Sequence, residues 1–170
     1  MLSTRLSSAV VATIALATLT VFAVRPAISQ DGDKNPVITK YADIDMRSLL
    51  TEMKLKFKES KDEDDLVVFD VDIDGTEMNI YQYTGAGEKI IDSLSFSVGY
   101  DLEKGMDMRP INEFNSRNRF VKAYLDEEND PFLVCDIRVK EGVTRETLKE
   151  TIKSYISAVG RFESALSGDE

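Results

Sequence analysis

A run of alternating aspartates, DVDIDG at residues 70–75, has the residue types and spacing to bind a divalent cation. It reproduces the first half of an EF-hand loop, in which carboxylate oxygens at alternate positions coordinate calcium. The second half does not match, because the twelfth position is Tyr81, where the loop needs a bidentate glutamate. The flanking residues also alternate as strands do, so the sequence excludes an EF-hand.

A smaller cation site remains a hypothesis at the same place. A two-residue turn at Asp74-Gly75 would set Asp72 opposite Glu77, and like charges that face each other destabilise a sheet. A divalent cation bound by Asp70, Asp72 and Glu77 would relieve this repulsion. The favoured alternative is a solvated acidic face that nearby lysines neutralise, so we predict no metal site.

A second candidate is a cluster of amide and guanidinium side chains formed by Asn112, Asn115, Arg117, Asn118 and Arg119. Such side chains are fixed hydrogen-bond donors for a peptide or a carboxylate. The candidate residues for binding a ligand or partner are Asn112, Asn115, Arg117 and Arg119. The favoured alternative is structural, because asparagine ends helices and the two arginines can pair with Asp126 or Asp136. The sequence leaves both interpretations open.

The residues available for catalysis are few. The chain has no histidine, the commonest general base at neutral pH, so a Ser-His-Asp or Cys-His relay cannot form. The single cysteine, Cys135, alternates with Leu133 and Ile137, which favours a buried structural thiol over a nucleophile. We predict no catalytic residue, no cofactor and no enzymatic activity. A carboxylate-based hydrolase is a weaker alternative, because acids are abundant but no pair has a recognisable spacing.

Residues 1–29 have the composition of a secretory signal peptide. Arg5 gives a positively charged start, and a long uncharged stretch follows it. Small residues at the −3 and −1 positions, Ala27 and Ser29, predict cleavage between Ser29 and Gln30. The alternative is an uncleaved anchor in the inner membrane, since the uncharged stretch is close to the length of a bilayer-spanning helix.

Composition narrows the compartment and the partners. One cysteine cannot form a disulfide within the chain, and an exported protein without disulfides fits a Gram-negative periplasm. The formal net charge of −10 repels phosphate backbones and anionic membrane surfaces. We therefore predict a periplasmic or secreted protein that binds no nucleic acid. We expect membrane contact only through the signal segment before cleavage.

The remaining residues divide into a flexible lead-in, residues 30–43, and one domain, residues 44–168. The first helix is predicted from an apolar stripe formed by Met46, Leu49, Leu50, Met53 and Phe57. A charged loop is expected at 58–65. The period then changes to two, which predicts strands at 66–73, 76–83 and 93–100, the first two joined by the Asp74-Gly75 turn.

The second half of the domain repeats this alternation of helix and sheet. Pro110 suits the first turn of a short helix that ends near Asn115. Strands follow near 120–126 and 132–140, and Thr144 is predicted to cap a long amphipathic helix. The order α-βββ-α-ββ-α predicts an α+β fold with a mainly antiparallel sheet of about five strands flanked by helices.

Several letters of this second half form a family pattern: the N-x-x-N of Asn112 and Asn115, the Arg119-Phe120 pair, AYLD at 123–126 and GVT at 142–144. In these letters the chain resembles the YbjN family, often described as bacterial sensory transduction regulators. The resemblance implies a type III secretion chaperone-like fold, in which two protomers often pair as a homodimer. One letter departs from the pattern, because Phe114 stands where relatives often carry tryptophan.

The leading interpretation is an exported, non-catalytic YbjN-like module that binds an unknown protein partner or regulates through it. The lack of catalytic residues and the family resemblance carry this interpretation. The alternative is a periplasmic protein that binds a small ligand or a divalent cation through the acidic hairpin or the Asn/Arg cluster.

Overall fold

The computed structural model describes residues 37–87 and 90–168. In chain order the elements are β1 (Val37–Ile38), α1 (Asp43–Glu52), β2 (Lys56–Lys61), β3 (Val67–Ile73), β4 (Thr76–Thr84), β5 (Ile91–Gly99), α2 (Met108–Arg117), β6 (Lys122–Leu125), β7 (Pro131–Arg138), β8 (Val143–Thr144) and α3 (Arg145–Ser167). The predicted leader and its cleavage site at Ser29 and Gln30 lie outside the described residues. Within those residues, no helix is both long and apolar enough to cross a membrane.

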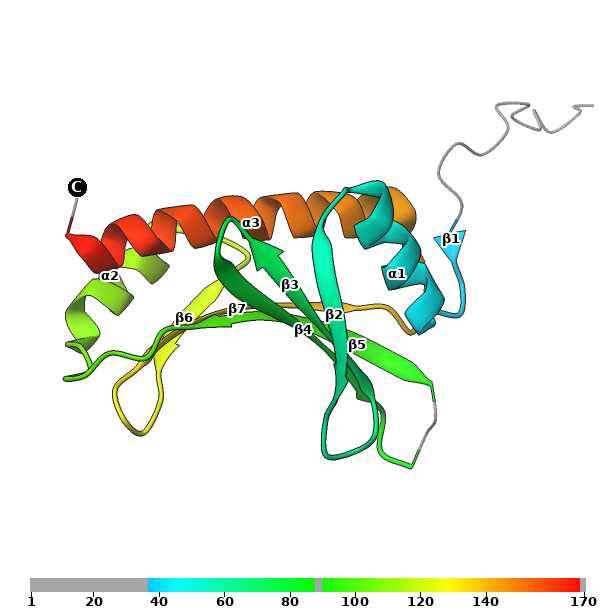
Figure 1. Ribbon diagram of the computed structural model, residues 1–170, viewed down its shortest axis with the longest axis horizontal. Helices are drawn as coiled ribbons and strands as arrows, with labels where there is room; N and C mark the ends of the chain where they lie inside the picture. Colours follow the sequence, from blue (N-terminus) through cyan, green and yellow to red (C-terminus); the bar gives the residue numbers. More distant parts are fainter. Residues whose placement is uncertain (1–36, 88–89, 169–170) are drawn as a thin grey trace, which may run out of the picture. The chain divides into compact units, whose positions relative to one another are not determined.

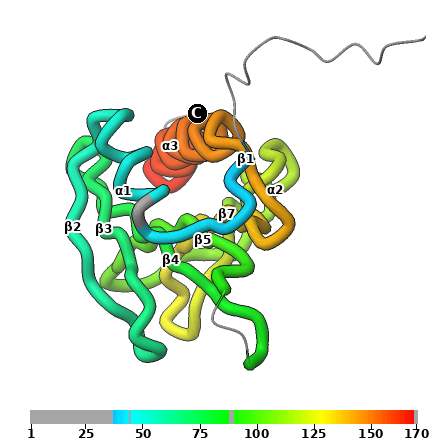
Figure 2. Tube along the Cα trace, turned by 90° about the vertical axis from the view of Figure 1, so that its right-hand side faces the viewer, coloured from blue at the N-terminus to red at the C-terminus, as the bar shows by residue number. Residues whose placement is uncertain are grey.

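Six strands form one antiparallel sheet in the order β2-β3-β4-β5-β7-β6. Helix α3 runs along one face of this sheet, α1 lies on the same side, and α2 packs near β6 (Figure 1). The view turned by 90° shows the sheet curving beneath α3 and α1 (Figure 2). The predicted α+β class, with an antiparallel sheet flanked by helices, is confirmed.

The hairpin between β3 and β4 has the predicted turn and register. Asp74 and Gly75 both have positive φ, 51° and 98°, as a two-residue type I′ turn requires. The register sets Asp72 directly opposite Glu77, and the Asp72 carboxylate accepts a hydrogen bond from the Gly75 amide at 2.8 Å. The two-residue period therefore predicted the turn and the register correctly, and the bounds of the two strands to within one residue.

The segment between α1 and β3 was predicted wrongly. We expected Phe57 to extend the first helix and residues 58–65 to form a loop, but Lys56–Lys61 form the edge strand β2. Lys54 has a positive φ of 59° and ends the helical path, and the chain then enters the strand. The sheet consequently has six strands where about five were expected.

The two ends of the domain meet beside the N-terminus of α3. Val37–Ile38, from the segment expected to be a lead-in, pair with Val143–Thr144 as a small second sheet. The Glu52 carboxylate accepts hydrogen bonds from the Arg145 guanidinium at 2.8 and 2.9 Å and also pairs with Lys149. These contacts fix α1 against α3.

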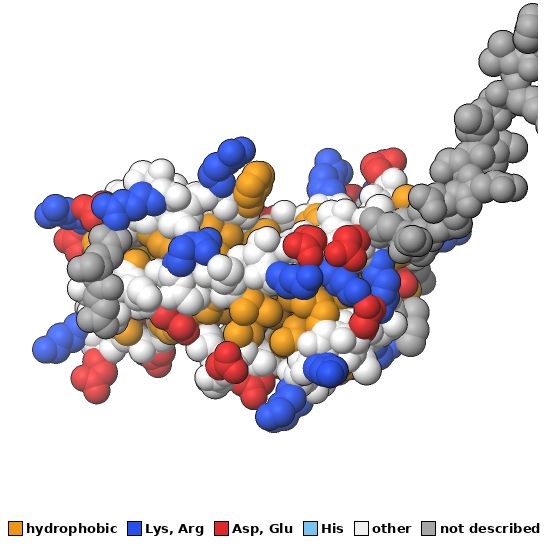
Figure 3. Space-filling view, turned by 90° about the horizontal axis from the view of Figure 1, so that it is seen from above, with side chains coloured by type: hydrophobic (Ala, Val, Ile, Leu, Met, Phe, Trp, Pro, Cys, Tyr) orange, Lys and Arg blue, Asp and Glu red, His pale blue; other side chains and the backbone are white. Residues whose placement is uncertain are grey.

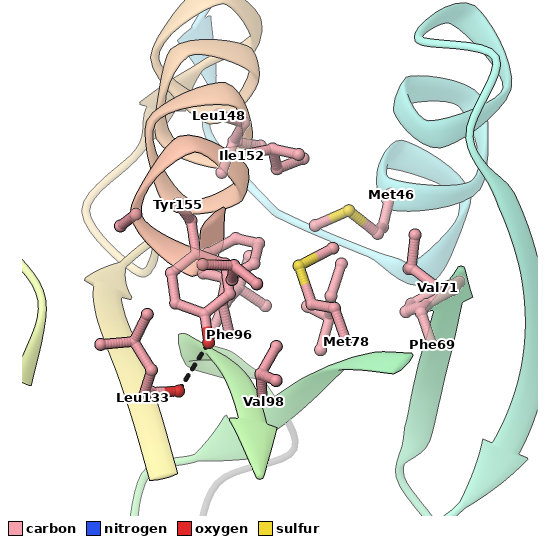
Figure 4. Close-up of a cluster of buried hydrophobic side chains, with 14 of the residues drawn as sticks. Met46, Phe69, Val71, Met78, Phe96, Val98, Leu133, Leu148, Ile152 and Tyr155 are labelled. Carbon is pink, nitrogen blue, oxygen red and sulfur yellow. Dashed lines mark hydrogen bonds between the residues drawn. The ribbon is translucent and has the colours of Figure 1, made fainter. Parts of the chain in front are cut away.

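The core lies between the sheet, α1 and α3 (Figure 4). Its labelled members are Met46, Phe69, Val71, Met78, Phe96, Val98, Leu133, Leu148, Ile152 and Tyr155. The Tyr155 hydroxyl donates a hydrogen bond to the Leu133 carbonyl at 2.6 Å, so the one polar atom of this ring is satisfied. The Thr144 hydroxyl accepts from the Thr147 amide at 3.0 Å, which confirms the predicted cap of α3.

Candidate functional site

The predicted Asn/Arg cluster lies at the end of α2 and in the turn into β6. Asn115 uses its amide within the fold: Nδ2 donates to the Ala123 carbonyl and Oδ1 accepts from the Ala123 amide, each at 2.9 Å. Asn112 is exposed on α2. The structural interpretation therefore holds for Asn115, which joins α2 to β6.

Asn118 ends α2 and links it to α3. Its Nδ2 donates to the Phe114 carbonyl at 2.9 Å, and its Oδ1 accepts from the Arg161 guanidinium at 2.9 Å. Arg117 occupies the exposed last turn of α2. The Arg119 guanidinium lies 4.9 Å from the centre of the Phe120 ring, a cation–π contact. The cluster is thus divided: Asn115 and Asn118 bond within the fold, whereas Asn112, Arg117 and Arg119 are exposed.

Phe120 is the least expected residue of this turn. Its ring is 82% exposed, the highest exposure among the large hydrophobic side chains described. Its φ is +65°, which is uncommon for a bulky residue and carries a strain of about 1–3 kcal/mol. A strained backbone that holds an apolar ring in water points to a function for the ring.

Phe120 stands at the rim of a groove between α3 and β7, which we call the α3–β7 groove. Its volume is about 920 Å³. Cys135 and Ile137 of β7, Val121, and Tyr155 and Ala158 of α3 supply the apolar part of its lining. On the face along which α3 runs, hydrophobic side chains are exposed between charged ones (Figure 3). The groove is therefore an amphipathic surface, unlike a closed catalytic pocket.

Cys135 forms part of the groove wall. The thiol is half-buried, and its side chain packs against the core on the face of Leu133 and Ile137, as the alternation predicted. Burial first, and the Asp136 carboxylate second, raise the pKa of the Cys135 thiol above its ordinary value. A nucleophilic cysteine needs the opposite shift, so this environment favours a structural thiol.

The negative charge of the acidic hairpin is balanced by lysines of β2, the strand that the sequence analysis did not predict. Lys56 and Lys58 of β2 stand opposite Asp72 and Asp70 in the register. The Asn79 amide donates to the Asp70 carboxylate at 3.0 Å. Among the described residues, no group of three carboxylate, thiol or imidazole side chains is placed to hold a metal ion. The lysines of β2 and the Asn79 amide are the partners that the solvated-face interpretation of DVDIDG expected.

Sequence reasoning missed the groove, although it singled out some of its neighbours. Arg119 lies both in the predicted cluster and on the groove, but Phe120 and Arg161 were not candidates. The available signal was an aromatic residue directly after Asn118 and Arg119, where a turn normally carries polar side chains.

Two solved structures support the fold, and a third has a weaker likeness to this chain. The E. coli YbjN crystal structure has a TM-score of 0.59 and 18% identity, and covers 78% of this chain and 97% of its own. An uncharacterized protein from Methanothermobacter thermautotrophicus has a TM-score of 0.51 and 20% identity, with 73% and 95% covered. The Yersinia pestis type III secretion chaperone SycH, solved in complex with a stable fragment of YscM2, has a TM-score of 0.47 and 14% identity, with 69% and 96% covered.

The sequence comparisons give the family. None of the curated proteins matches this chain. The model of the YbjN family, described as "Putative bacterial sensory transduction regulator", matches residues 45–167. This match spans nearly all of the described residues, and it was expected from the letters around Asn112, Phe120 and Gly142. The chain therefore belongs to the YbjN family.

Proposed function

We propose that this chain is an exported, non-catalytic module that binds another protein through the α3–β7 groove and regulates by that contact. The observation that carries the proposal is Phe120, an aromatic ring 82% exposed on a strained backbone at the groove rim. Burial of such a ring by a partner would contribute roughly 1.5–3 kcal/mol. Aromatic and arginine side chains dominate the binding energy of protein interfaces, and Arg119 stacks on this ring.

The chemistry of the groove supports a binding role over a catalytic one. The chain has no histidine, and the one cysteine on the groove has a raised pKa. The groove also lacks an enclosed polar centre, since apolar side chains of α3 and β7 form much of its lining. The geometry gives no observation that favours the small-ligand, cation or hydrolase alternatives.

Residues 1–29 support export. We expect the mature chain to begin at Gln30 and to appear in the periplasmic fraction of a Gram-negative host. Intact-mass measurement of the protein purified from fractionated cells checks both points. A full-length mass in the membrane fraction would instead support the inner-membrane anchor, and a full-length mass in the cytoplasm would overturn the export proposal.

The binding role is tested by photo-crosslinking in intact cells. A photoreactive phenylalanine analogue replaces Phe120 in one variant and Lys58, on the opposite sheet edge, in a control variant. The proposal expects a discrete crosslinked protein from position 120, identified by mass spectrometry, and none from position 58. Circular dichroism of both variants confirms that they fold. Equal or absent crosslinking at the two positions would contradict the proposal.

A further inference from the structure

We infer that the partner contributes an extended segment that adds to the free edge of β7 as an antiparallel strand, with a carboxylate near its C-terminal end beside Arg119 and Arg161. This inference rests on the proposed function, because it specifies what the α3–β7 groove binds. It joins three observations: an unpaired stretch of β7, an apolar groove along that stretch, and two guanidinium groups at one end.

Only half of β7 has a neighbour on its outer side. β6 pairs with residues 131–134, from Leu125 opposite Pro131 to Lys122 opposite Val134. Within the described residues, no strand pairs with 135–138 on that side. Phe120, with its positive φ, lies in the turn between α2 and β6. The residues of this turn do not pair with β7, and pairing begins only at Lys122. The strained residue thus coincides with the point at which the edge becomes free.

The backbone of this free stretch points outward at alternate residues. Odd-numbered residues of β7 face β5: the Pro131 carbonyl accepts from the Tyr100 amide at 3.1 Å, and the Val139 amide, one residue past β7, donates to the Asp92 carbonyl of β5 at 2.8 Å. Backbone groups of successive residues in a strand face opposite neighbours, so those of Asp136 and Arg138 face away from β5. They are available to a further strand, and an edge of this kind is the usual acceptor for strand addition.

The two edges of the sheet differ in how they are protected. β2 carries Lys56, Lys58 and Lys61, all exposed, and charged edge strands of this kind discourage further pairing. The free half of β7 instead borders the groove, where Cys135, Ile137 and Ala158 present apolar surface. A segment added here would bury every second side chain in the groove, as β6 buries Ala123.

Charge fixes the direction of the segment. Arg119 and Arg161 both line the groove, and neither has a carboxylate partner among the described residues: Arg119 stacks on Phe120, and Arg161 bonds Asn118 and Ser157. The carboxylates that line the groove, Asp136, Glu146 and Glu150, belong to β7 and to the first turns of α3, so the end that carries Arg119 and Arg161 favours an anion. A strand antiparallel to β7 runs from the Arg138 end toward Val121, so its C-terminal end reaches the two arginines.

The test measures the binding of a synthetic peptide to the full-length protein as purified from cells. The peptide is acetyl-Thr-Val-Thr-Ile-Thr-Val-Glu-amide, with a fluorophore on its first residue. Fluorescence anisotropy measures its affinity beside that of a peptide ending in lysine. The inference expects the glutamate peptide to bind at least about tenfold more tightly, since a lysine at this position replaces attraction to two arginines by repulsion from them. Arg161→Glu and, separately, Arg119→Glu should reverse this preference. Equal binding of the two peptides, or no binding, overturns the inference.

Strand addition is tested by methylating the peptide nitrogens. In an added strand only alternate amides of the peptide bond to β7, so N-methylation of one alternate set should weaken binding at least about tenfold and the other set should change it little. Equal effects of the two sets overturn the strand geometry. A partner crosslinked at position 120 that shows neither charge nor register dependence would leave the proposed function standing while this inference fails.

Discussion

The side chain of Asn115 pairs with the backbone of Ala123 as a neighbouring strand would, giving one hydrogen bond and accepting another, each at 2.9 Å. Asn115 lies in the last turns of α2, and Ala123 lies in the edge strand β6. The two bonds place the helix directly against the strand. They also set the geometry of the turn between them, which holds Arg119 and Phe120.

We expect Asn115→Ala to lower the free energy of unfolding by about 2 kcal/mol, because a half-buried carbonyl and amide of β6 lose their partners. Urea denaturation followed by circular dichroism measures this difference. Asn112→Ala, at an exposed position of the same helix, is the matched control and should stay within about 0.5 kcal/mol of the parent chain. Similar effects of the two substitutions would refute the pairing role of Asn115.

Gly99 lies against the ring of Phe132, which leaves no room for a Cβ at this position. A Cβ at this position would lie 2.3 Å from Cε1 of Phe132, whose ring stacks on Tyr124 with centroids 5.4 Å apart. Gly99→Ala should therefore cost roughly 1–3 kcal/mol of stability, since the ring must move. In the double variant with Phe132→Ala most of this cost should vanish, and a double-mutant cycle in urea measures the coupling. Additive losses would show that the two positions do not clash.

The pair between α1 and α3 makes a pH-dependent contribution to stability. Hydrogen bonds from Lys149 and then Arg145 lower the pKa of Glu52 below its ordinary value. A carboxylate with a lowered folded-state pKa stabilises the fold above its unfolded pKa of about 4.3 and loses this contribution as the pH falls through the folded value. We expect the stability difference between the parent chain and Glu52→Gln to shrink below about pH 4. Thermal unfolding from pH 3 to pH 7 tests this, and a difference that stays constant would contradict it.

The thiol on the groove should react slowly. Burial, and then the neighbouring Asp136, raise the pKa of Cys135, so the folded chain holds less thiolate than a free cysteine at every pH below the raised value. We expect iodoacetamide to alkylate the folded chain more slowly than the urea-unfolded chain at pH 8. Asp136→Asn should restore part of the rate, because it removes the second cause of the shift. A folded rate equal to the unfolded rate would mean that Cys135 is an ordinary exposed thiol.

The sequence predicted elements best where one face of the element is buried. The apolar stripe of α3 and the turn at Asp74-Gly75 lie in strong periodic patterns, and both were predicted correctly. β2 was missed because it is an edge strand whose residues, KFKESK, are mostly charged and exposed. Its one large apolar residue, Phe57, also continued the helical spacing from Met53, so local periodicity favoured the wrong element.

The candidate site was predicted only in part, for a different reason. The cluster around Asn115 was visible as polar letters, but hydrogen bonds that decide their roles depend on contacts with Ala123 and Arg161. The groove depends on the outward turn of Phe120 and on the late start of β6, at Lys122 instead of the predicted 120. Both are backbone conformations. The aromatic residue after Asn118 and Arg119 was a visible signal, but it did not indicate a positive φ, because glycine or asparagine is the usual residue in that conformation.

The small sheet of β1 and β8 has a consequence for the order in which the chain acquires its fold. Val37 pairs with Thr144, and α1 is held by residues of α3, so the first and last parts of the domain complete each other. Contacts between parts so distant in sequence form slowly, because the long loop between them must close first. In a nascent chain that ends before Val143, β1 therefore has no strand to pair with and Glu52 of α1 has no cation from α3, so this junction closes only once the C-terminal part of the domain is present.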